Sequence, residues 1–499
     1  MKKNPETRVF GFIALVFFVV GLIFAGRSSM EFDDLATIGM CSKDFSFSQM
    51  FAACVVDDRN PILSHIIYFL WFKIAPYGDV WTRLVSVTEV AFGIFICGLL
   101  GTRLRNIRVG VLFAVLTGII VTRYCGYTIR PYGLLFLISS AVMYMYVIRC
   151  GEYGEEQMKT QLILGLLYGL LANTHYTGCL IITAFFLADL LMVLLRKSNP
   201  IVLVSYALAA VMFMPWLLLG IVIPAARGAS FLVSSGASAK GGVSDVAALA
   251  QSSLFSGMFA GFQCILLAAF LFFVAELAAI LFKGRFSAKR HTACYVFVFA
   301  LVFMAAVMTI YTMRDMTNSL FAARYFVAVV PVYILCVISG IDMFLVYVTG
   351  GEAVAVKRKQ AAAALLLAAF VVFLAPVFVR SASRSVHPFR QTTDILLAQK
   401  DIGNKDVLVL RRITGCADNS QLKGWKDYYL TRGGKDGAVN VDFRINEDTL
   451  KGINKVYFCV IPSYGHVDNE KMFFDTFELT KQLTDGDAEV NVFERRTQQ

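Results

Sequence analysis

Apolar residues along this chain gather into long runs, and short polar segments separate them. An α-helix needs roughly 20 apolar residues to cross about 30 Å of hydrocarbon. Eleven runs approach or reach this length, so the pattern predicts a polytopic α-helical membrane protein. The predicted spans are residues 8–25, 82–102, 109–122, 132–149, 160–173, 176–195, 200–223, 257–282, 292–311, 325–347 and 361–379.

A long connection, residues 26–81, follows the first predicted span. It contains an aromatic, apolar run from Pro61 to Lys73 that is short for a span and precedes a Pro-Tyr-Gly-Asp turn signal. Because Trp and Tyr are favoured at membrane–water interfaces, we expect this run to form a helix lying in the interface. If it crossed the membrane instead, every later loop would change sides.

The composition changes near residue 380, where short strand-like runs replace the long apolar ones. Possible helices lie between them, for example from Asn469 to Gln482. This alternation predicts a small α/β domain with a partly parallel sheet. We therefore divide the chain into a membrane domain, 1–379, and a soluble domain, 380–499. The strand-like runs are residues 406–410, 455–461 and 489–493.

Charge refines the orientation. Only 16% of the residues are charged, and the net charge of +11 is spread over short basic clusters between alternate spans. The positive-inside rule explains such clusters, so the excess charge does not indicate a nucleic-acid partner. We expect a multi-pass protein of the inner or plasma membrane, with the N-terminus in the cytoplasm and the C-terminal domain outside. The clusters lie at residues 2–3, 103–108, 149–159, 196–197, 283–290 and 357–359.

Charged residues beside membrane spans are costly, and they are therefore functional candidates. The acidic pair Asp33-Asp34 follows the first span, and arginines lie at the outer ends of later spans. A guanidinium group suits phosphate oxygens, and a carboxylate can take a proton from an attacking hydroxyl. Together they predict a transferase that uses a phosphate-linked donor held in lipid. The arginines are Arg123, Arg130, Arg314 and Arg324.

Structural alternatives remain open for these residues. Arginines at helix ends also anchor to lipid headgroups. Asp57-Asp58 favours a turn and a helix start. A lone histidine such as His175 is more often a hydrogen-bonding residue than a metal ligand.

Six short segments share the predicted outer side and follow one another in a set order: Asp33-Asp34, 60–63, 82–86, 127–132, 174–176 and 323–326 with Pro331. Over roughly residues 1–345, this order and spacing resemble the GT-C superfamily of integral-membrane glycosyltransferases. Within it, the chain resembles the branch of protein mannosyltransferases and the lipid A aminoarabinose transferase. The resemblance implies a GT-C-like fold.

The resemblance also implies roles. Asp33 would be the general base with Asp34 beside it, Arg130, Arg324, Arg123 and Arg314 would bind the donor phosphate, and Tyr132, His175, Tyr176 and Tyr325 would contact substrate. Two departures stand out. Thr128 replaces the Glu of the family pattern, which puts a second carboxylate or a metal-binding role there in doubt, and Asn60-Pro61-Ile62 replaces the usual His-Pro-Pro.

The implied reaction transfers a sugar from a polyprenyl-phosphate donor to a hydroxyl of a glycan, lipid or protein acceptor at the outer face of the membrane. No cysteine–histidine cluster has zinc spacing, so no metal ligand is assigned, and a requirement for a divalent cation stays open. Two other classes also remain: a lipid or sugar transporter or flippase, although no internal repeat is clear, and a catalytically inactive GT-C relative.

Overall fold

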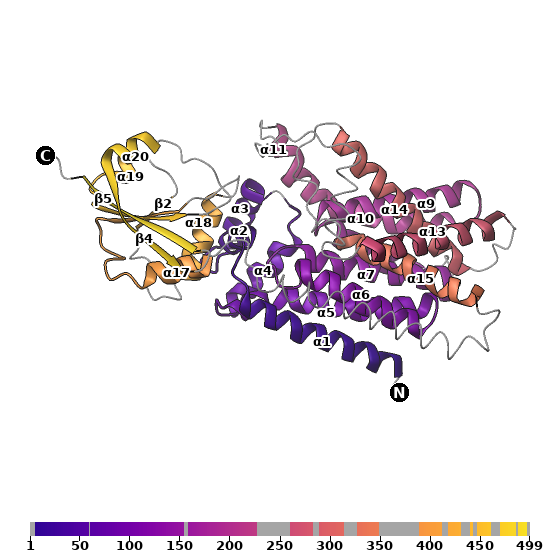
Figure 1. Ribbon diagram of the computed structural model, residues 1–499. Helices are drawn as coiled ribbons and strands as arrows, with labels where there is room; N and C mark the ends of the chain where they lie inside the picture. The colour runs from indigo at the N-terminus through magenta and orange to yellow at the C-terminus, as the bar shows by residue number, and fades with distance from the viewer. Residues whose placement is uncertain are drawn as a thin grey trace.

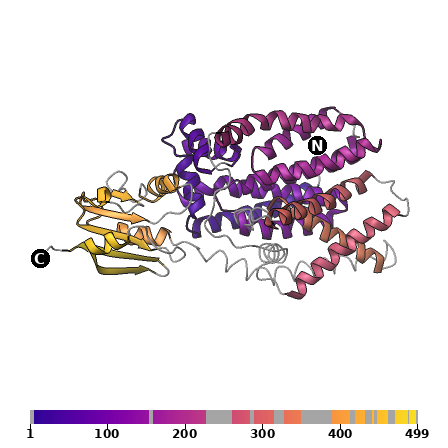
Figure 2. The same cartoon turned by 90° about the horizontal axis from the view of Figure 1, so that it is seen from above.

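The computed structural model of the chain contains a helical bundle and a C-terminal α/β lobe, with α2 (Phe32–Met40) and α3 (Phe47–Ala53) between them (Figure 1). The view from above also places the sheet of the C-terminal lobe at one end of the bundle (Figure 2). The structure describes residues 5–58, 60–153, 158–226, 260–282, 289–313, 327–348, 389–411, 418–430, 440–442, 447–460, 470–485 and 488–496.

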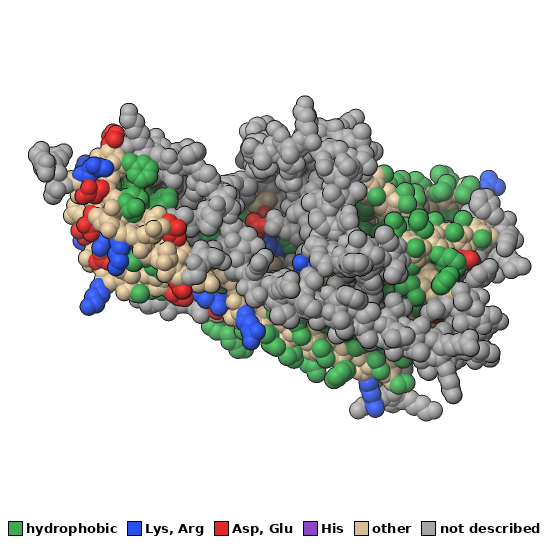
Figure 3. Space-filling model, in the orientation of Figure 1, with side chains coloured by type: hydrophobic (Ala, Val, Ile, Leu, Met, Phe, Trp, Pro, Cys, Tyr) green, Lys and Arg blue, Asp and Glu red, His purple; other side chains and the backbone are tan. Residues whose placement is uncertain are grey.

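The first ten predicted spans coincide with helical segments, and the eleventh, 361–379, lies outside the described residues. Among the described residues, five helices are long and apolar enough to cross a membrane. Where the bundle surface is drawn in colour, hydrophobic side chains cover much of it, whereas charged ones gather on the C-terminal lobe (Figure 3). The bundle helices are α1 (Pro5–Arg27), α5 (Asp79–Leu104), α6 (Ile107–Cys125), α7 (Tyr132–Ile148), α8 (Met158–Ala172), α9 (Tyr176–Leu194), α10 (Val204–Trp216), α13 (Ala260–Phe282), α14 (Lys289–Met313) and α15 (Val330–Val348).

Small residues let the bundle helices approach closely. A Cβ atom on Gly101 of α5 would lie 2.8 Å from the Cα atom of Gly110 in α6, which is too close for any side chain. Lipid offers no hydrophobic drive for helix association, so close van der Waals packing of this kind holds membrane helices together.

A buried ion pair joins three helices at the end of the bundle far from the C-terminal lobe. Arg149, which continues α7, donates through Nη2 to Asp189 Oδ1 of α9 at 2.8 Å, and both side chains are almost fully buried. The hydroxyls of Tyr146 and Tyr206 donate to the same carboxylate at 2.8 and 2.6 Å. Asp189 therefore links α7, α9 and α10 through three hydrogen bonds.

The expected interfacial segment is a helix, α4 (Leu63–Ile74). Its 12 residues are too few to span about 30 Å of hydrocarbon. One face is buried, including His65, Tyr68 and Phe72, at the spacing of an amphipathic helix. Before it, a π-helical turn, Cys54–Asp58, continues α3.

The C-terminal lobe contains the expected partly parallel sheet, with strand order β2-β1-β3-β5-β4. Strand β1 pairs in parallel with β2 and β3, whereas β5 is antiparallel to β3 and β4. The three predicted strand runs are confirmed as β1, β3 and β5. The elements are α17 (Phe389–Leu397), β1 (Val407–Arg411), α18 (Asp418–Trp425), β2 (Asn440–Asp442), α19 (Glu447–Leu450), β3 (Lys455–Val460), α20 (Glu470–Thr476), β4 (Phe477–Asp485) and β5 (Ala488–Arg495).

The helix expected from Asn469 to Gln482 is wrong over its second half. Helix α20 ends at Thr476, and Phe477 begins strand β4. The segment instead extends the sheet as its edge strand, because one side of its backbone pairs with β5. The two residues between the paired Asp485 and Ala488 are Gly-Asp, a sequence typical of a two-residue hairpin turn.

We expect Asp189→Asn to destabilise the bundle by about 3–5 kcal/mol, because Arg149 would keep a buried positive charge without a carboxylate. Equilibrium unfolding in detergent micelles measures the loss. Glu494→Gln is the matched control, since Glu494 is 53% exposed and lies 3.8 Å from Lys455. That variant should cost less than about 1 kcal/mol. Equal losses in the two variants would contradict the assigned role of the buried pair.

Candidate active site

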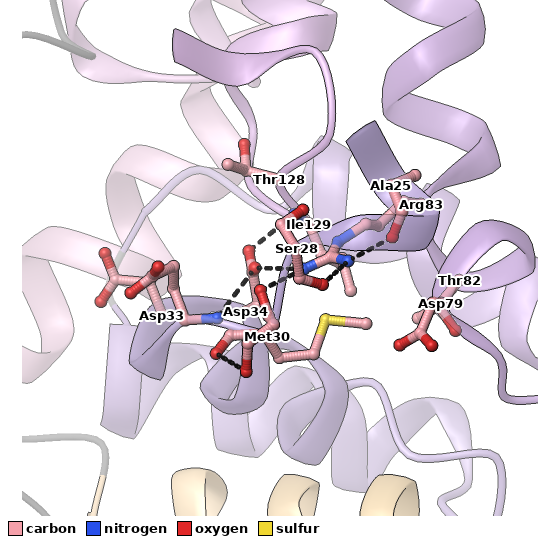
Figure 4. A network of polar contacts seen from close by, with 12 residues as sticks. Ala25, Ser28, Met30, Asp33, Asp34, Asp79, Thr82, Arg83, Thr128 and Ile129 are labelled. Carbon is pink, nitrogen blue, oxygen red and sulfur yellow. Dashed lines mark hydrogen bonds and ion pairs between the residues drawn. The ribbon is translucent and has the colours of Figure 1, made fainter. Parts of the chain in front are cut away.

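Asp34, the second member of the acidic pair, is buried at the start of α2. Its carboxylate accepts hydrogen bonds from the backbone N–H groups of Ile129 (2.8 Å) and Glu31 (3.2 Å), and Arg83 Nη2 lies 3.7 Å away. Only 1% of the residue is exposed. Burial raises the pKa of Asp34, while Arg83 and the two N–H groups oppose that rise. Figure 4 shows the carboxylate enclosed by these partners.

Arg83 connects this carboxylate to the end of the first membrane helix. Its guanidinium donates to the carbonyl oxygens of Ala25, Ser28 and Ser29 at 2.8, 2.9 and 2.6 Å. The residue is fully buried. Carbonyl groups at the end of a helix have no hydrogen-bond donor within the helix. Here the guanidinium group of Arg83, from α5, is the donor.

Asp33 lies on a different side of α2 from Asp34. Successive residues of a helix are about 100° apart, and Asp33 points away from Arg83 (Figure 4). Its side chain is partly exposed. Thr37, one turn further on, donates from Oγ1 to the Asp33 carbonyl at 3.0 Å. The two carboxylates therefore do not form one unit: Asp34 is enclosed, and Asp33 is accessible.

A cluster of charged groups lies against the Thr37 side of α2. Arg130 Nη1 donates to Thr37 Oγ1 at 3.3 Å, and Arg130 Nη2 lies 3.2 Å from Asp58 Oδ1. The other oxygen of Asp58 lies 3.0 Å from His65 Nε2. Asn60 donates to Asp58 Oδ1 at 2.9 Å. Asp33 and Thr37 are four residues apart on one helix face, so the cluster and Asp33 lie on the same side of α2.

Opposite charges in this cluster shift the pKa values of Asp58 and His65 toward the charged form. Burial would raise the pKa of Asp58, but Arg130 and His65 outweigh it and hold that pKa well below its usual range. Burial alone would lower the pKa of His65, but the Asp58 carboxylate raises it. The sequence interpretation of Asp57-Asp58 as a turn missed these contacts. His65, in the predicted interfacial helix that follows, was the residue that could have indicated a partner for Asp58.

Of the remaining predicted residues, four are described by the structure and three are not. Tyr132 and His175 are buried, with ring centroids 5.7 Å apart where α7 and α9 begin. His175 caps α9, accepting through Nδ1 from the Thr177 N–H at 3.2 Å. The Tyr176 hydroxyl accepts from Trp216 Nε1 at 3.2 Å. Arg123 is half-buried in the last turn of α6, and Arg314, Arg324 and Tyr325 lie outside the described residues.

Thr128 stands where the family pattern has a Glu, and its backbone carbonyl accepts a hydrogen bond from the Ser86 hydroxyl. Asp58 instead supplies the carboxylate beside Arg130. In the part of the chain that the structure describes, no group of three or more His, Cys, Asp or Glu side chains could hold a metal ion.

Comparisons with known proteins show which solved structures have a similar fold. No protein-family model and no curated protein matches the sequence. The structure is similar to ArnT from Cupriavidus metallidurans in the apo state, at 13% identity, 97% coverage of both chains and a TM-score of 0.56. ArnT bound to undecaprenyl phosphate gives 14% identity, 97% coverage of both chains and a TM-score of 0.52.

The oligosaccharyltransferase of Archaeoglobus fulgidus, in a complex with Zn and sulfate, is a third similar structure. It shares 13% identity, covers 91% of this chain and 68% of its own, and gives a TM-score of 0.52. All three are GT-C structures. The chain has the GT-C fold. The expected polytopic helical architecture with a small C-terminal sheet region is therefore confirmed.

Within this GT-C fold, the candidate residues gather where the bundle meets the C-terminal lobe. Helix α2, which carries Asp33, lies at that end, and the N-terminal end of α1 lies at the other (Figure 1). Arg130 contacts Thr37 of α2 and Asp58. Here an accessible carboxylate and buried cationic groups share one side of α2. Such a site can take up a proton and hold an anion close together.

We expect His65→Gln to lower the melting temperature by about 2–4 °C at pH 6. The folded-state pKa of His65 is raised above its unfolded value of about 6.5, so its protonation stabilises the fold below that pH. This contribution is lost as the pH rises through the folded pKa, so the gap in melting temperature should narrow as the pH is raised. Thermal unfolding of the wild-type protein and the His65→Gln variant at a series of pH values from 6 to 9 measures the difference in melting temperature. A gap that widens with pH would contradict the assigned charge.

Proposed function

We propose that this protein transfers a sugar from a polyprenyl-phosphate-linked donor to a hydroxyl group of an envelope glycan, lipid or protein. The observation that carries the proposal is the accessible Asp33 beside the buried Arg130–Asp58–His65 cluster, in a fold shared with ArnT. An ArnT structure contains undecaprenyl phosphate, and a donor of that class, with its tail in lipid, fits a site at the end of a membrane bundle.

The proposed chemistry is a single displacement. The acceptor hydroxyl attacks the anomeric carbon, the bond between that carbon and the phosphate oxygen breaks, and the lipid phosphate leaves with the electron pair. Asp33 accepts the hydroxyl proton as general base. Preorganised cations stabilise the charge that develops on the leaving phosphate.

Arg130 alone does not provide a net charge for that phosphate, because Asp58 lies 3.2 Å from its guanidinium. With His65 protonated, however, the three groups together carry one positive charge, and a buried positive charge favours an anion. We propose that Arg123, Arg314 and Arg324 add to this charge. Tyr132, His175, Tyr176 and Tyr325 are proposed to contact the substrates, since three of them lie where α7 and α9 begin.

We further propose that this site faces the outside of an inner or plasma membrane, with the N-terminus in the cytoplasm. The alternation of basic loops supports this orientation. The position of the C-terminal lobe, at the end of the bundle opposite to the N-terminal end of α1, also supports it.

Asp33→Asn should lower sugar transfer about 10²–10⁴-fold, because the amide cannot take up the hydroxyl proton. The assay uses purified protein and follows the release of polyprenyl phosphate together with transfer of its sugar. A parallel reaction with a chelator measures whether a divalent cation is required.

Asp44→Asn, at an exposed carboxylate of the same outer loop, is the matched control and should keep full activity. Full transfer by Asp33→Asn would refute the assignment of the base. Movement of the intact donor across the bilayer without release of its phosphate would instead favour a flippase.

A further inference from the structure

The C-terminal lobe contacts the helix that carries Asp33. We propose that this lobe positions α2 for sugar transfer, through a crossing of α2 and α18 at Gly39 and Gly424. The inference rests on the proposed function, in which Asp33 is the base. Gly39 and Gly424 would be positioning residues, since neither has a side chain to touch substrate.

The crossing leaves no room for side chains. A Cβ atom on Gly39 would lie 1.8 Å from the carbonyl oxygen of Ser420, and one on Gly424 would lie 1.8 Å from that of Leu35. The backbones of α2 and α18 are therefore in direct contact. Because backbone atoms cannot move aside as a flexible side chain can, any larger residue must separate the two helices.

The lobe also binds the chain at both ends of α2. Before the helix, the Met30 N–H donates to the Tyr429 hydroxyl at 3.2 Å, and Ser29 Oγ lies 3.2 Å from that hydroxyl. After the helix, Ser42 Oγ donates to Asp427 Oδ2 at 2.7 Å. These contacts fix the position of α2 along its axis as well as its distance from α18.

A second set of contacts ties the lobe to the bundle itself. Arg390 Nη2 donates to the Ser28 carbonyl oxygen at 2.9 Å and lies 3.2 Å from Asp79 Oδ1. The Tyr428 hydroxyl donates to the same Asp79 oxygen at 2.5 Å. The lobe is therefore attached to the ends of α1 and α5 as well as to α2.

Helix geometry explains how the contact would reach Asp33. At about 100° per residue, Asp34, Gly39 and Asp33 lie on three different sides of α2. Asp34 faces the bundle and Gly39 faces α18, so the two contacts hold the helix from two directions. Pushing on the Gly39 side while Asp34 stays bound would tilt α2 and move the Asp33 carboxylate. A displacement of about 1 Å at a catalytic group can cost about 100-fold in rate.

The test is Gly424→Ala in the full-length protein. We expect kcat to fall about 10–100-fold, while KM for the donor and the number of undecaprenyl phosphate sites per protein stay unchanged. Gly11→Ala is the matched control, because a Cβ atom on Gly11 meets nothing within 4 Å, and it should keep wild-type kcat. An unchanged kcat in Gly424→Ala, or a fall only in proportion to lost binding sites, would overturn the proposal.

Tyr429→Phe provides a milder second variant, since it removes only the hydroxyl that Met30 and Ser29 contact. A lower kcat at unchanged KM and melting temperature supports positioning, and an unchanged kcat opposes it. If the wild-type protein transfers no sugar, the proposed function fails first. Hydrogen exchange then still tests whether the C-terminal lobe fixes the position of α2. Faster exchange of the α2 amides in Gly424→Ala supports this, and unchanged exchange overturns it.

Discussion

One buried guanidinium group determines how the first membrane helix ends and where the chain goes next. Arg83 bonds three carbonyl oxygens at the end of α1 and faces the Asp34 carboxylate. A buried charge is costly unless hydrogen bonds and a nearby counter-charge offset its loss of water, and both Nη atoms of Arg83 have such partners. The ending of α1, the start of α2 and the burial of Asp34 are therefore one linked arrangement. The exposure of Asp33 follows from it, because a helix that buries one residue turns its neighbour elsewhere.

Helix α2 has only nine residues, yet it contacts three parts of the molecule. The bundle holds it through Asp34, the charged cluster through Thr37, and the C-terminal lobe through Gly39. A helix of this length has little stability of its own, so its position comes from its neighbours. Chemistry at Asp33 would thus depend on residues that are far apart in the sequence.

Hydropathy predicted the membrane helices well because hydrocarbon leaves the backbone few alternatives. The sequence also indicated Arg130 as a candidate, since an arginine beside a span is conspicuous, and its binding of phosphate stays a prediction. The sequence could not show that Asp34 is enclosed, because its partners Arg83 and Ile129 come from other helices. Asp58 and His65 were missed for the same reason, and strand β4 because only its pairing with β5 distinguishes it from a helix. The contact of Gly39 with Ser420 joins segments almost 400 residues apart, and no local pattern signals it.

The ion pair at the opposite end of the bundle has a consequence for how the protein is made. Asp189 lies within an apolar helix, and a single Asp costs about 2.5–3.5 kcal/mol when such a helix enters the bilayer alone. Its partners Arg149 and Tyr146 precede it in the chain, and Tyr206 follows it. Helix α9 therefore gains by leaving the translocon together with α7 and α10 rather than singly. During synthesis, the segment with Arg149 and Tyr146 precedes α9, and α10 with Tyr206 follows it.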